Sequence, residues 1–262
     1  FHGKAIVINY RGGNADSFLT SAPRWVKWTM LSASSIVVPS RYLHDVFAKH
    51  GLKAEIIPNI IDFELFRARR EGPADSAPCL LVARNLEQIY DIPTVIEAFV
   101  GVLSEYPRAR LVVAGSGPER QNLEALAKRL GISEAITFVG RIDHADMPKL
   151  YEAADVAINP STVDNMPNSL LEAFACGVPV VSTNVGGVPY IAHDGITALL
   201  VPPRNPKAMS AALMELLRDK SLYLRLRNNA LTEVQQYGWG QVRDQWLDCY
   251  RRNTSNRHEE PS

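Results

Sequence analysis

Two carboxylates stand eight positions apart, at Asp164 and Glu172, in the segment STVDNMPNSLLEAFACGVPVVSTNVGG, residues 161–187. We expect Asp164 to lie in a polar turn and Glu172 to lie in the first turn of an apolar helix. A carboxylate can accept a pair of hydrogen bonds from neighbouring hydroxyls, as on a ribose or a hexose. Two simpler interpretations stay open. Asp164 could serve only as a turn residue, and Glu172 could act as a helix cap, although a buried carboxylate needs partners.

Groups that suit a phosphate follow other apolar runs. Arg84 comes directly after CLLVA, and Arg141 follows AITFVG. The forked guanidinium of an arginine matches phosphate oxygens, and the unpaired N–H groups at a helix start also suit an anion. A diphosphate between two diol-bearing sugars is a nucleotide-sugar, so this combination predicts such a ligand. Both arginines could instead be solvated loop residues. The helix start concerned consists of Met166, Pro167, Asn168 and Ser169.

Glycines mark the turns beside these groups. Gly115 opens the stretch GSGPER after an apolar run, and Gly140 ends AITFVG. A short glycine motif before a helix is a weak sign of nucleotide binding and is equally typical of a tight turn. Gly186 and Gly187 follow another apolar run, and we expect them to permit a close backbone approach to the ligand.

The elements that must position these groups alternate along the chain. Short apolar strands that alternate with helices of ten or more residues predict an α/β fold with a parallel sheet covered on both faces. Such sheets bind ligands at the carboxyl ends of their strands. The expected strands are residues 4–10, 35–40, 54–58, 79–83, 109–115, 135–140, 155–160 and 178–183. The expected helices are residues 23–31, 40–50, 92–106, 118–130, 145–154 and 169–176, followed by a tail that is helical throughout 206–252.

Composition excludes several classes of protein. The 262 residues are 46% hydrophobic and 21% charged, which is typical of a globular protein with a buried core. Basic and acidic residues number 28 each, so nothing predicts electrostatic binding to nucleic acid. The three cysteines have no metal-ligand spacing and favour a reducing compartment. No apolar run approaches the length of about 18 residues that a membrane-spanning helix needs.

The chain resembles the retaining glycosyltransferases of family 4, which have the GT-B fold of two Rossmann-like domains facing a cleft. The resemblance covers nearly the whole chain, and its most specific motif is SLLEAFACGVPVVSTNVGGVP, with the second acid of the family's paired-acid signature. Further matches are AEIIPNIIDFELF, LLVARN, VVAGSGPERQNLEALAKRLGI, ITFVGRI and YGWGQVRDQWLDCY.

The resemblance implies a domain organisation. It predicts part of an N-terminal acceptor-side domain (1–66), a linker (67–78), a Rossmann-like donor-binding domain (79–236), a C-terminal crossover helix (237–255) and a disordered tail (256–262). The first part of the N-terminal domain is expected to be missing. The chain on its own is therefore expected to bind nucleoside diphosphate, to transfer no sugar and to associate through an exposed sheet edge.

The resemblance also implies roles for residues at matching positions. Glu172 would hold the ribose hydroxyls, Asp164 would contact the transferred sugar, and Arg84 would stabilise the departing diphosphate. Gly140 and Arg141 would line the base pocket. The further donor-binding residues would be Gly115 and the helix start, Met166, Pro167, Asn168 and Ser169. Neither a cofactor nor a metal is expected, and UDP is the expected nucleotide of the donor.

Three departures from the family pattern affect these roles. Asp164 stands where the family has the first glutamate of its signature, and Ile89 and Tyr90 stand in the region of a usual lysine. Tyr190 replaces an acid that often follows the Gly-Gly-x-Pro motif. On the acceptor side, Arg11 in NYRGGNADSF could meet an anionic acceptor, or it could be an ordinary loop arginine.

We therefore predict a hexosyltransferase that moves a sugar from a nucleoside-diphosphate sugar to a saccharide, lipid-linked or small-molecule acceptor, with retention. The alternatives are a non-catalytic nucleotide-sugar-binding module and a nucleotide-sugar epimerase of the same fold. The family suggests polysaccharide biosynthesis in the cytoplasm, with peripheral membrane contact through the missing N-terminal part as a further expectation.

Overall fold

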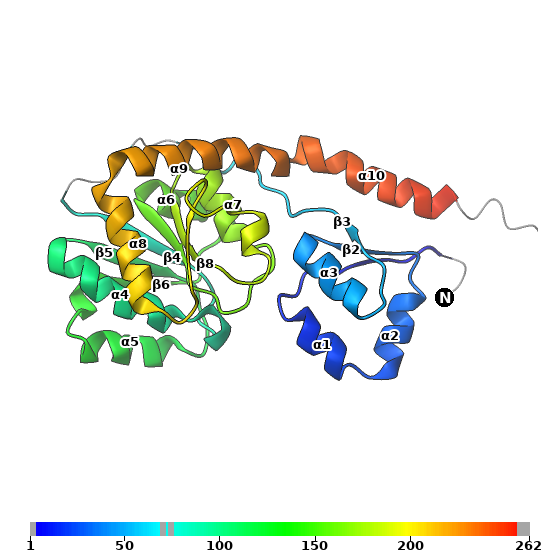
Figure 1. Cartoon of the computed structure of the whole chain (residues 1–262), viewed down its shortest axis with the longest axis horizontal. Coiled ribbons are helices and arrows are strands. Elements are labelled where there is room, and N and C mark those ends of the chain that lie inside the picture. The colour runs from blue at the N-terminus through cyan, green and yellow to red at the C-terminus, as the bar shows by residue number, and fades with distance from the viewer. Residues whose placement is uncertain (1–3, 69–71, 73–75, 256–262) are drawn as a thin grey trace, which may run out of the picture.

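The computed structural model describes residues 4–68, 72 and 76–255. Within these, the chain forms two lobes, each with its own parallel sheet (Figure 1). We call residues 4–59 the N-lobe and residues 76–237 the C-lobe. The predicted tail, 256–262, and part of the predicted linker lie outside the described residues.

The N-lobe sheet has three parallel strands in the order β1-β2-β3, which are Val7–Asn9, Ser35–Val38 and Glu55–Ile56. Helices α1 (Ala15–Ser21), α2 (Arg24–Leu31) and α3 (Arg41–Lys49) accompany the sheet. Ser40 caps α3 as predicted, because its hydroxyl accepts a hydrogen bond from the Leu43 N–H at 3.2 Å. Helix α1 was not predicted from the sequence, and the three observed strands are shorter than the predicted ones.

The C-lobe sheet has six parallel strands in the order β6-β5-β4-β7-β8-β9. This is the doubly wound order in which the first and fourth strands of the lobe, β4 and β7, are neighbours and the direction of winding reverses between them. The strands are β4 (Cys79–Ala83), β5 (Arg110–Ala114), β6 (Ile136–Gly140), β7 (Val156–Asn159), β8 (Val180–Thr183) and β9 (Leu199–Val201). The predicted parallel α/β fold is confirmed, although the three-residue strand β9 was not predicted.

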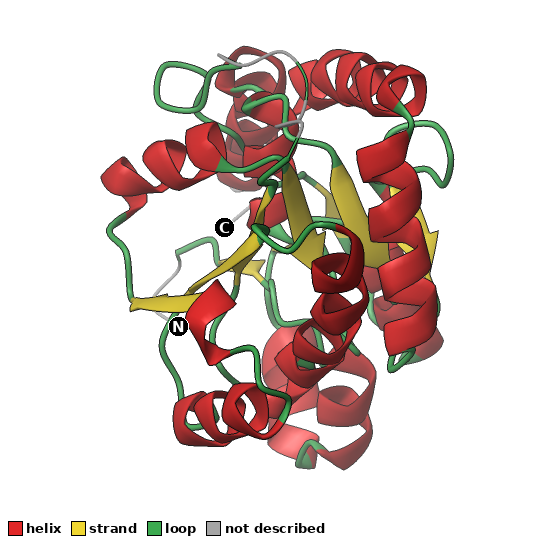
Figure 2. Ribbon diagram, turned by 90° about the vertical axis from the view of Figure 1, so that its left-hand side faces the viewer, coloured by secondary structure: helices red, strands yellow, loops and turns green. Residues whose placement is uncertain are grey.

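Helices cover both faces of this sheet (Figure 2). Buried side chains of α4 (Ile92–Glu105), α5 (Arg120–Arg129) and α8 (Pro206–Arg218) share one core cluster. Side chains of α6 (Met147–Ala153) and α7 (Asn168–Ala175) belong to a second cluster, and α9 (Lys220–Glu233) contributes to both. The rigid sheet between the two cores fixes the loops at its strand ends.

The predicted continuous helical tail is wrong, because the chain breaks it twice. The Asp219 carboxylate accepts hydrogen bonds from the N–H groups of Ser221 and Leu222 at 2.9 and 3.0 Å, so it ends α8 and starts α9. A short 3-10 helix and Gly238 then separate α9 from α10 (Trp239–Ser255).

Helix α10 returns from the C-lobe to the N-lobe sheet (Figure 1). Its Val242 and Cys249 are fully buried against Val37 and Ile57. Burial raises the pKa of the Cys249 thiol to about 11. Helix α10 starts beside the C-lobe and packs on the N-lobe, so it spans the two lobes.

The loops that follow β7 and β8 make close backbone contacts with each other. A Cβ atom on Gly187 would lie 1.8 Å from the carbonyl oxygen of Asn165, and one on Gly186 would lie 2.1 Å from that of Asp164. The close approach that Gly186 and Gly187 permit is therefore to the chain's own backbone.

Gly187→Ala is expected to lower the free energy of unfolding by about 1–3 kcal/mol, because the added methyl overlaps a carbonyl that belongs to a packed loop. Gly240→Ala is the matched control, since a Cβ atom there meets nothing within 4 Å. It should leave the stability unchanged or raise it by up to about 1 kcal/mol through helix propensity. Urea unfolding of the two variants checks this, and equal midpoints would contradict the close contact.

Candidate functional site

A cleft of about 1280 Å³ lies between the N-lobe and the carboxyl ends of β4, β5 and β7. Its walls contain ten of the eleven site residues that the sequence predicted. These are Arg11, Arg84, Gly115, Arg141, Asp164, Met166, Pro167, Asn168, Ser169 and Glu172. The cleft therefore sits at the point where the C-lobe sheet reverses its winding, which is where such sheets bind ligands.

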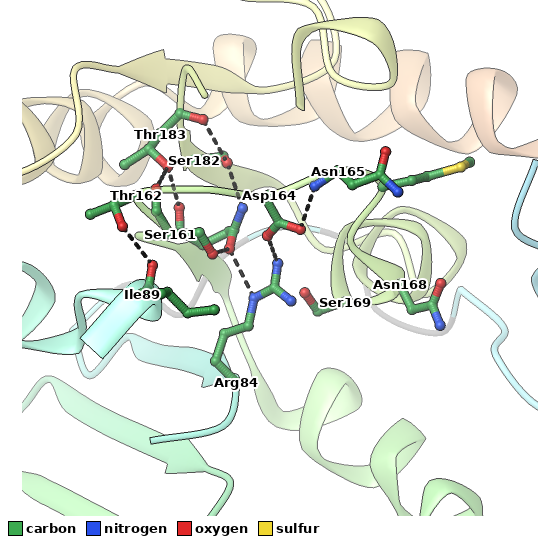
Figure 3. A network of polar contacts seen from close by, with 12 residues as sticks. Arg84, Ile89, Ser161, Thr162, Asp164, Asn165, Asn168, Ser169, Ser182 and Thr183 are labelled. Carbon is green, nitrogen blue, oxygen red and sulfur yellow. Dashed lines mark hydrogen bonds and ion pairs between the residues drawn. The ribbon is translucent and has the colours of Figure 1, made fainter. Parts of the chain in front are cut away.

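Three contacts hold Arg84 at the end of β4, and Figure 3 shows the one with Asp164. Its Nε donates to Oδ1 of Asn159 at 2.9 Å, and its Nη2 forms an ion pair with Asp164. Its guanidinium carbon lies 5.1 Å from the centre of the Tyr90 ring, a cation–π contact. Only 12% of each side chain of the ion pair is exposed, so little water screens it.

The loop that carries Asp164 is braced by its own polar contacts. Oδ1 of Asp164 accepts from the Asn165 N–H at 2.9 Å, and its carbonyl accepts from the Gly187 N–H at 3.0 Å. The Thr183 hydroxyl donates to the Ser161 carbonyl at 2.6 Å (Figure 3). A braced loop fixes the direction of the Asp164 carboxylate toward Arg84.

Glu172 lies in the second turn of α7, so the prediction that it occupies the first turn is wrong. Its side chain makes no capping hydrogen bond at the start of α7, so the interpretation of Glu172 as a helix cap is also wrong. Its Oε2 accepts from the Tyr151 hydroxyl at 2.9 Å, and its Oε1 is 3.9 Å from Nδ1 of His144. Burial raises the pKa of the Glu172 carboxyl, and the Tyr151 hydrogen bond opposes that shift.

The structure does not bring Gly140 into the wall of the cleft. Its φ of 75° is a backbone conformation that glycine favours, and its carbonyl accepts from the Gly115 N–H at 2.8 Å. The next residue, Arg141, lines the cleft and is exposed. Gly140 therefore shapes the site through its backbone, while Arg141 lines the cleft itself.

The N-lobe touches the start of α7 through Asn59, which the sequence analysis missed. The Asn59 Nδ2 group donates to the Met166 carbonyl and to Oδ1 of Asn168, both at 2.9 Å. Ser40 donates to Asn165 beside it. Asn59 follows β3 at the edge of the N-lobe sheet, so the strand-end rule that selected Arg84 could have found it.

Other missed residues had weaker signals. Asn159 is the last residue of β7, and a strand-end search could have included it. Tyr151 gave no local signal, because its partner Glu172 lies 21 positions further along, on another helix.

Comparison with known proteins agrees with this geometry. The family model described as glycosyl transferases group 1 matches residues 66–233. An uncharacterized glycosyltransferase of Methanocaldococcus jannaschii is 31% identical over 184 residues, which cover 70% of this chain and 47% of that protein. A D-inositol 3-phosphate glycosyltransferase of Streptomyces bingchenggensis is 33% identical over 195 residues, covering 70% and 42%. The chain thus spans about half the length of these curated relatives.

Solved structures show the same fold over almost the whole chain. Sucrose-phosphate synthase from Thermosynechococcus elongatus has a TM-score of 0.82 at 23% identity, covering 95% of this chain and 68% of that one. HepE of Anabaena, solved in complex with UDP and glucose, has a TM-score of 0.81 at 19% identity, covering 94% and 71%. The predicted GT-B fold class is therefore confirmed. Since the family model matches more than half of its residues, the chain belongs to the glycosyl transferases of group 1.

Proposed function

We propose that the whole protein transfers a hexose-type sugar from a nucleoside-diphosphate sugar, with UDP as the expected nucleotide, to an acceptor hydroxyl. The reaction retains the configuration of the anomeric carbon, as in the family 4 enzymes that the sequence resembles. One observation carries the proposal: Arg84, Asp164 and Glu172 converge on one cleft at the switch point of the C-lobe sheet, opposite the N-lobe.

Glu172 is the proposed contact for the ribose. Tyr151 occupies its Oε2, which leaves Oε1 and the remaining lone pairs for the ribose hydroxyls. The backbone N–H groups of the α7 start, residues 166–169, lie in the same wall and would meet the phosphates and the sugar. Asp164 would bind hydroxyls of the transferred sugar, and Arg141 would face the base.

Arg84 is the proposed group for the departing diphosphate. Negative charge grows on the leaving phosphate as the anomeric bond breaks, and a guanidinium that is already fixed stabilises this charge without reorganising. Asn159 and Tyr90 fix it here from two sides. The acceptor hydroxyl would attack on the face that the diphosphate leaves, and the diphosphate would help to take its proton. No metal is needed in this scheme.

A non-catalytic nucleotide-sugar-binding module is the second candidate. Ile89 and Tyr90 favour it, because they stand in the region where the family has a basic lysine. Incubation of the protein with UDP-glucose and an acceptor mixture separates the two, since only the transferase releases UDP or forms a glycosylated product.

No helix among the described residues is long and apolar enough to cross a membrane. We propose that the enzyme works in the cytoplasm on a glycan or lipid-linked acceptor, with peripheral contact to the membrane.

Arg84→Ala is expected to reduce kcat of the whole protein by about 10²–10³ while weakening UDP-glucose binding far less, because the leaving-group charge is largest in the transition state. Arg41→Ala, which removes an exposed N-lobe arginine that pairs with Asp45 outside the cleft, is the control and should change neither. Steady-state kinetics and calorimetry measure the two effects. Equal losses in kcat and affinity would mean that Arg84 contributes ground-state binding only.

Glu172→Gln is expected to weaken UDP binding by about 1–3 kcal/mol, the range for lost hydrogen bonds to a charged group. The amide keeps the size of the side chain, so the fold should persist. Calorimetry with UDP checks the affinity, and Glu124→Gln on the exposed surface of α5 is the matched control. An unchanged UDP affinity in Glu172→Gln would contradict the proposed contact between Glu172 and the ribose.

The raised pKa of Glu172 predicts two opposite pH dependences. UDP-glucose affinity should fall as the pH drops through this pKa, above the ordinary value of 4.5, because a protonated carboxyl accepts hydrogen bonds less well. The contribution of Glu172 to the free energy of unfolding should instead rise over the same drop, since the folded chain holds the proton more tightly than the unfolded chain. Glu172→Gln should flatten both profiles, and an unchanged pH profile in that variant would contradict the assignment.

A further inference from the structure

The N-lobe wall of the cleft has one side chain that is charged at neutral pH, Arg11, among the residues that the structure describes. It follows β1 and stands among uncharged neighbours. The N-lobe residues of this wall are Tyr10, Arg11, Gly12, Gly13, Asn14, Ser17, Phe18, Ser21 and Asn59.

The charge of Arg11 has no carboxylate to balance it within the described chain. Its Nε donates to Oδ1 of Asn9 at 3.2 Å and its Nη1 to Oδ1 of Asn59 at 2.5 Å, and both acceptors are neutral amides. The acid on the neighbouring α1, Asp16, is already engaged by Lys49 and His50 at 2.9 and 2.7 Å. Arg84 across the cleft differs, because Asp164 neutralises it.

Two amides orient this guanidinium without neutralising it. The Asn59 side chain that accepts from Arg11 also donates to the Met166 carbonyl and to Asn168 at the start of α7. Arg11 is thereby tied to the wall where the sugar donor is proposed to bind. The Nη2 group of Arg11 makes no hydrogen bond to the described residues and remains available as a donor.

Neutral groups surround Arg11 on the same wall. Asn14 and Ser17 provide polar side chains, and Phe18 is 42% exposed. A fixed, unneutralised guanidinium beside neutral donors and an aromatic face matches a ligand that carries one anionic group on a hydroxyl-bearing body.

We propose that the N-lobe wall binds the acceptor through an anionic group, a phosphate or a carboxylate, and that Arg11 is the residue that selects it. The inference rests on the proposed function, because it takes the ligand of this wall to be the sugar acceptor. It assigns the acceptor to the class of phosphorylated or acidic hydroxyl compounds, either soluble or as a lipid headgroup.

The test measures anion binding on protein that has been saturated with UDP, so that the diphosphate site is filled. Glycerol 3-phosphate and glycerol are titrated into the wild type, Arg11→Gln, Arg11→Lys and the control Arg41→Gln by calorimetry. We expect the wild type to bind glycerol 3-phosphate in preference to glycerol, and Arg11→Gln to bind it about tenfold or more weakly. Arg11→Lys should retain part of the affinity, and Arg41→Gln should retain all of it.

A lipid source is tested in parallel with vesicles of phosphatidylglycerol in phosphatidylcholine against phosphatidylcholine alone. Arg11-dependent binding to the vesicles without binding to glycerol 3-phosphate identifies a lipid headgroup. Arg11-dependent binding to glycerol 3-phosphate without binding to the vesicles identifies a soluble acceptor. Either result supports the proposal. Equal binding by the wild type and Arg11→Gln, or no anion binding in either arm, overturns it.

The binding of UDP to the wild type tests the proposed function independently of the role of Arg11. If the wild type does not bind UDP, the donor site is misassigned, and the same titrations without nucleotide still test whether Arg11 selects an anion.

Discussion

The ion pair of Arg84 and Asp164 is the interaction on which the cleft depends. It joins the loops after β4 and β7, the two strands between which the sheet reverses its winding. A largely buried pair is costly unless its remaining hydrogen-bonding groups are satisfied. Asn159 and the Asn165 N–H meet this need, and each comes from β7 or its loop. The pair thus fixes the guanidinium of Arg84, whose charge Asp164 balances, at the place where a diphosphate is proposed to bind.

The rest of the fold keeps this pair facing the N-lobe. Helix α10 buries Val242 and Cys249 on the N-lobe sheet, and Asn59 reaches across the cleft to the start of α7. Gly187 allows its loop to press on the Asn165 carbonyl. The two walls of the cleft are therefore connected through hydrogen bonds as well as through the chain, which suits the proposed reaction, because that reaction must exclude water between two substrates.

Much of the fold and part of the site could be predicted from the sequence, for reasons that differ between residues. Arg84 and Asp164 follow apolar strands, and in a parallel sheet all such positions meet at one edge. Helix α1 was missed because it has only seven residues, although its apolar residues Ala15, Phe18 and Leu19 have helical spacing. Tyr151 was missed because its contact with Glu172 joins two helices. The break at Asp219 has a signal in the sequence, an N-cap residue within a helical pattern, although the tail was predicted to be continuous.

The central claim is that the cleft at the switch point binds a nucleoside-diphosphate sugar between Arg84, Glu172 and the start of α7. A crystal structure of the protein soaked with UDP-glucose tests it most directly. The account predicts ribose hydroxyls on the Glu172 carboxylate and diphosphate oxygens on Arg84 and the N–H groups of residues 166–169. Nucleotide bound elsewhere, or in this cleft with its ribose away from Glu172, would contradict the account.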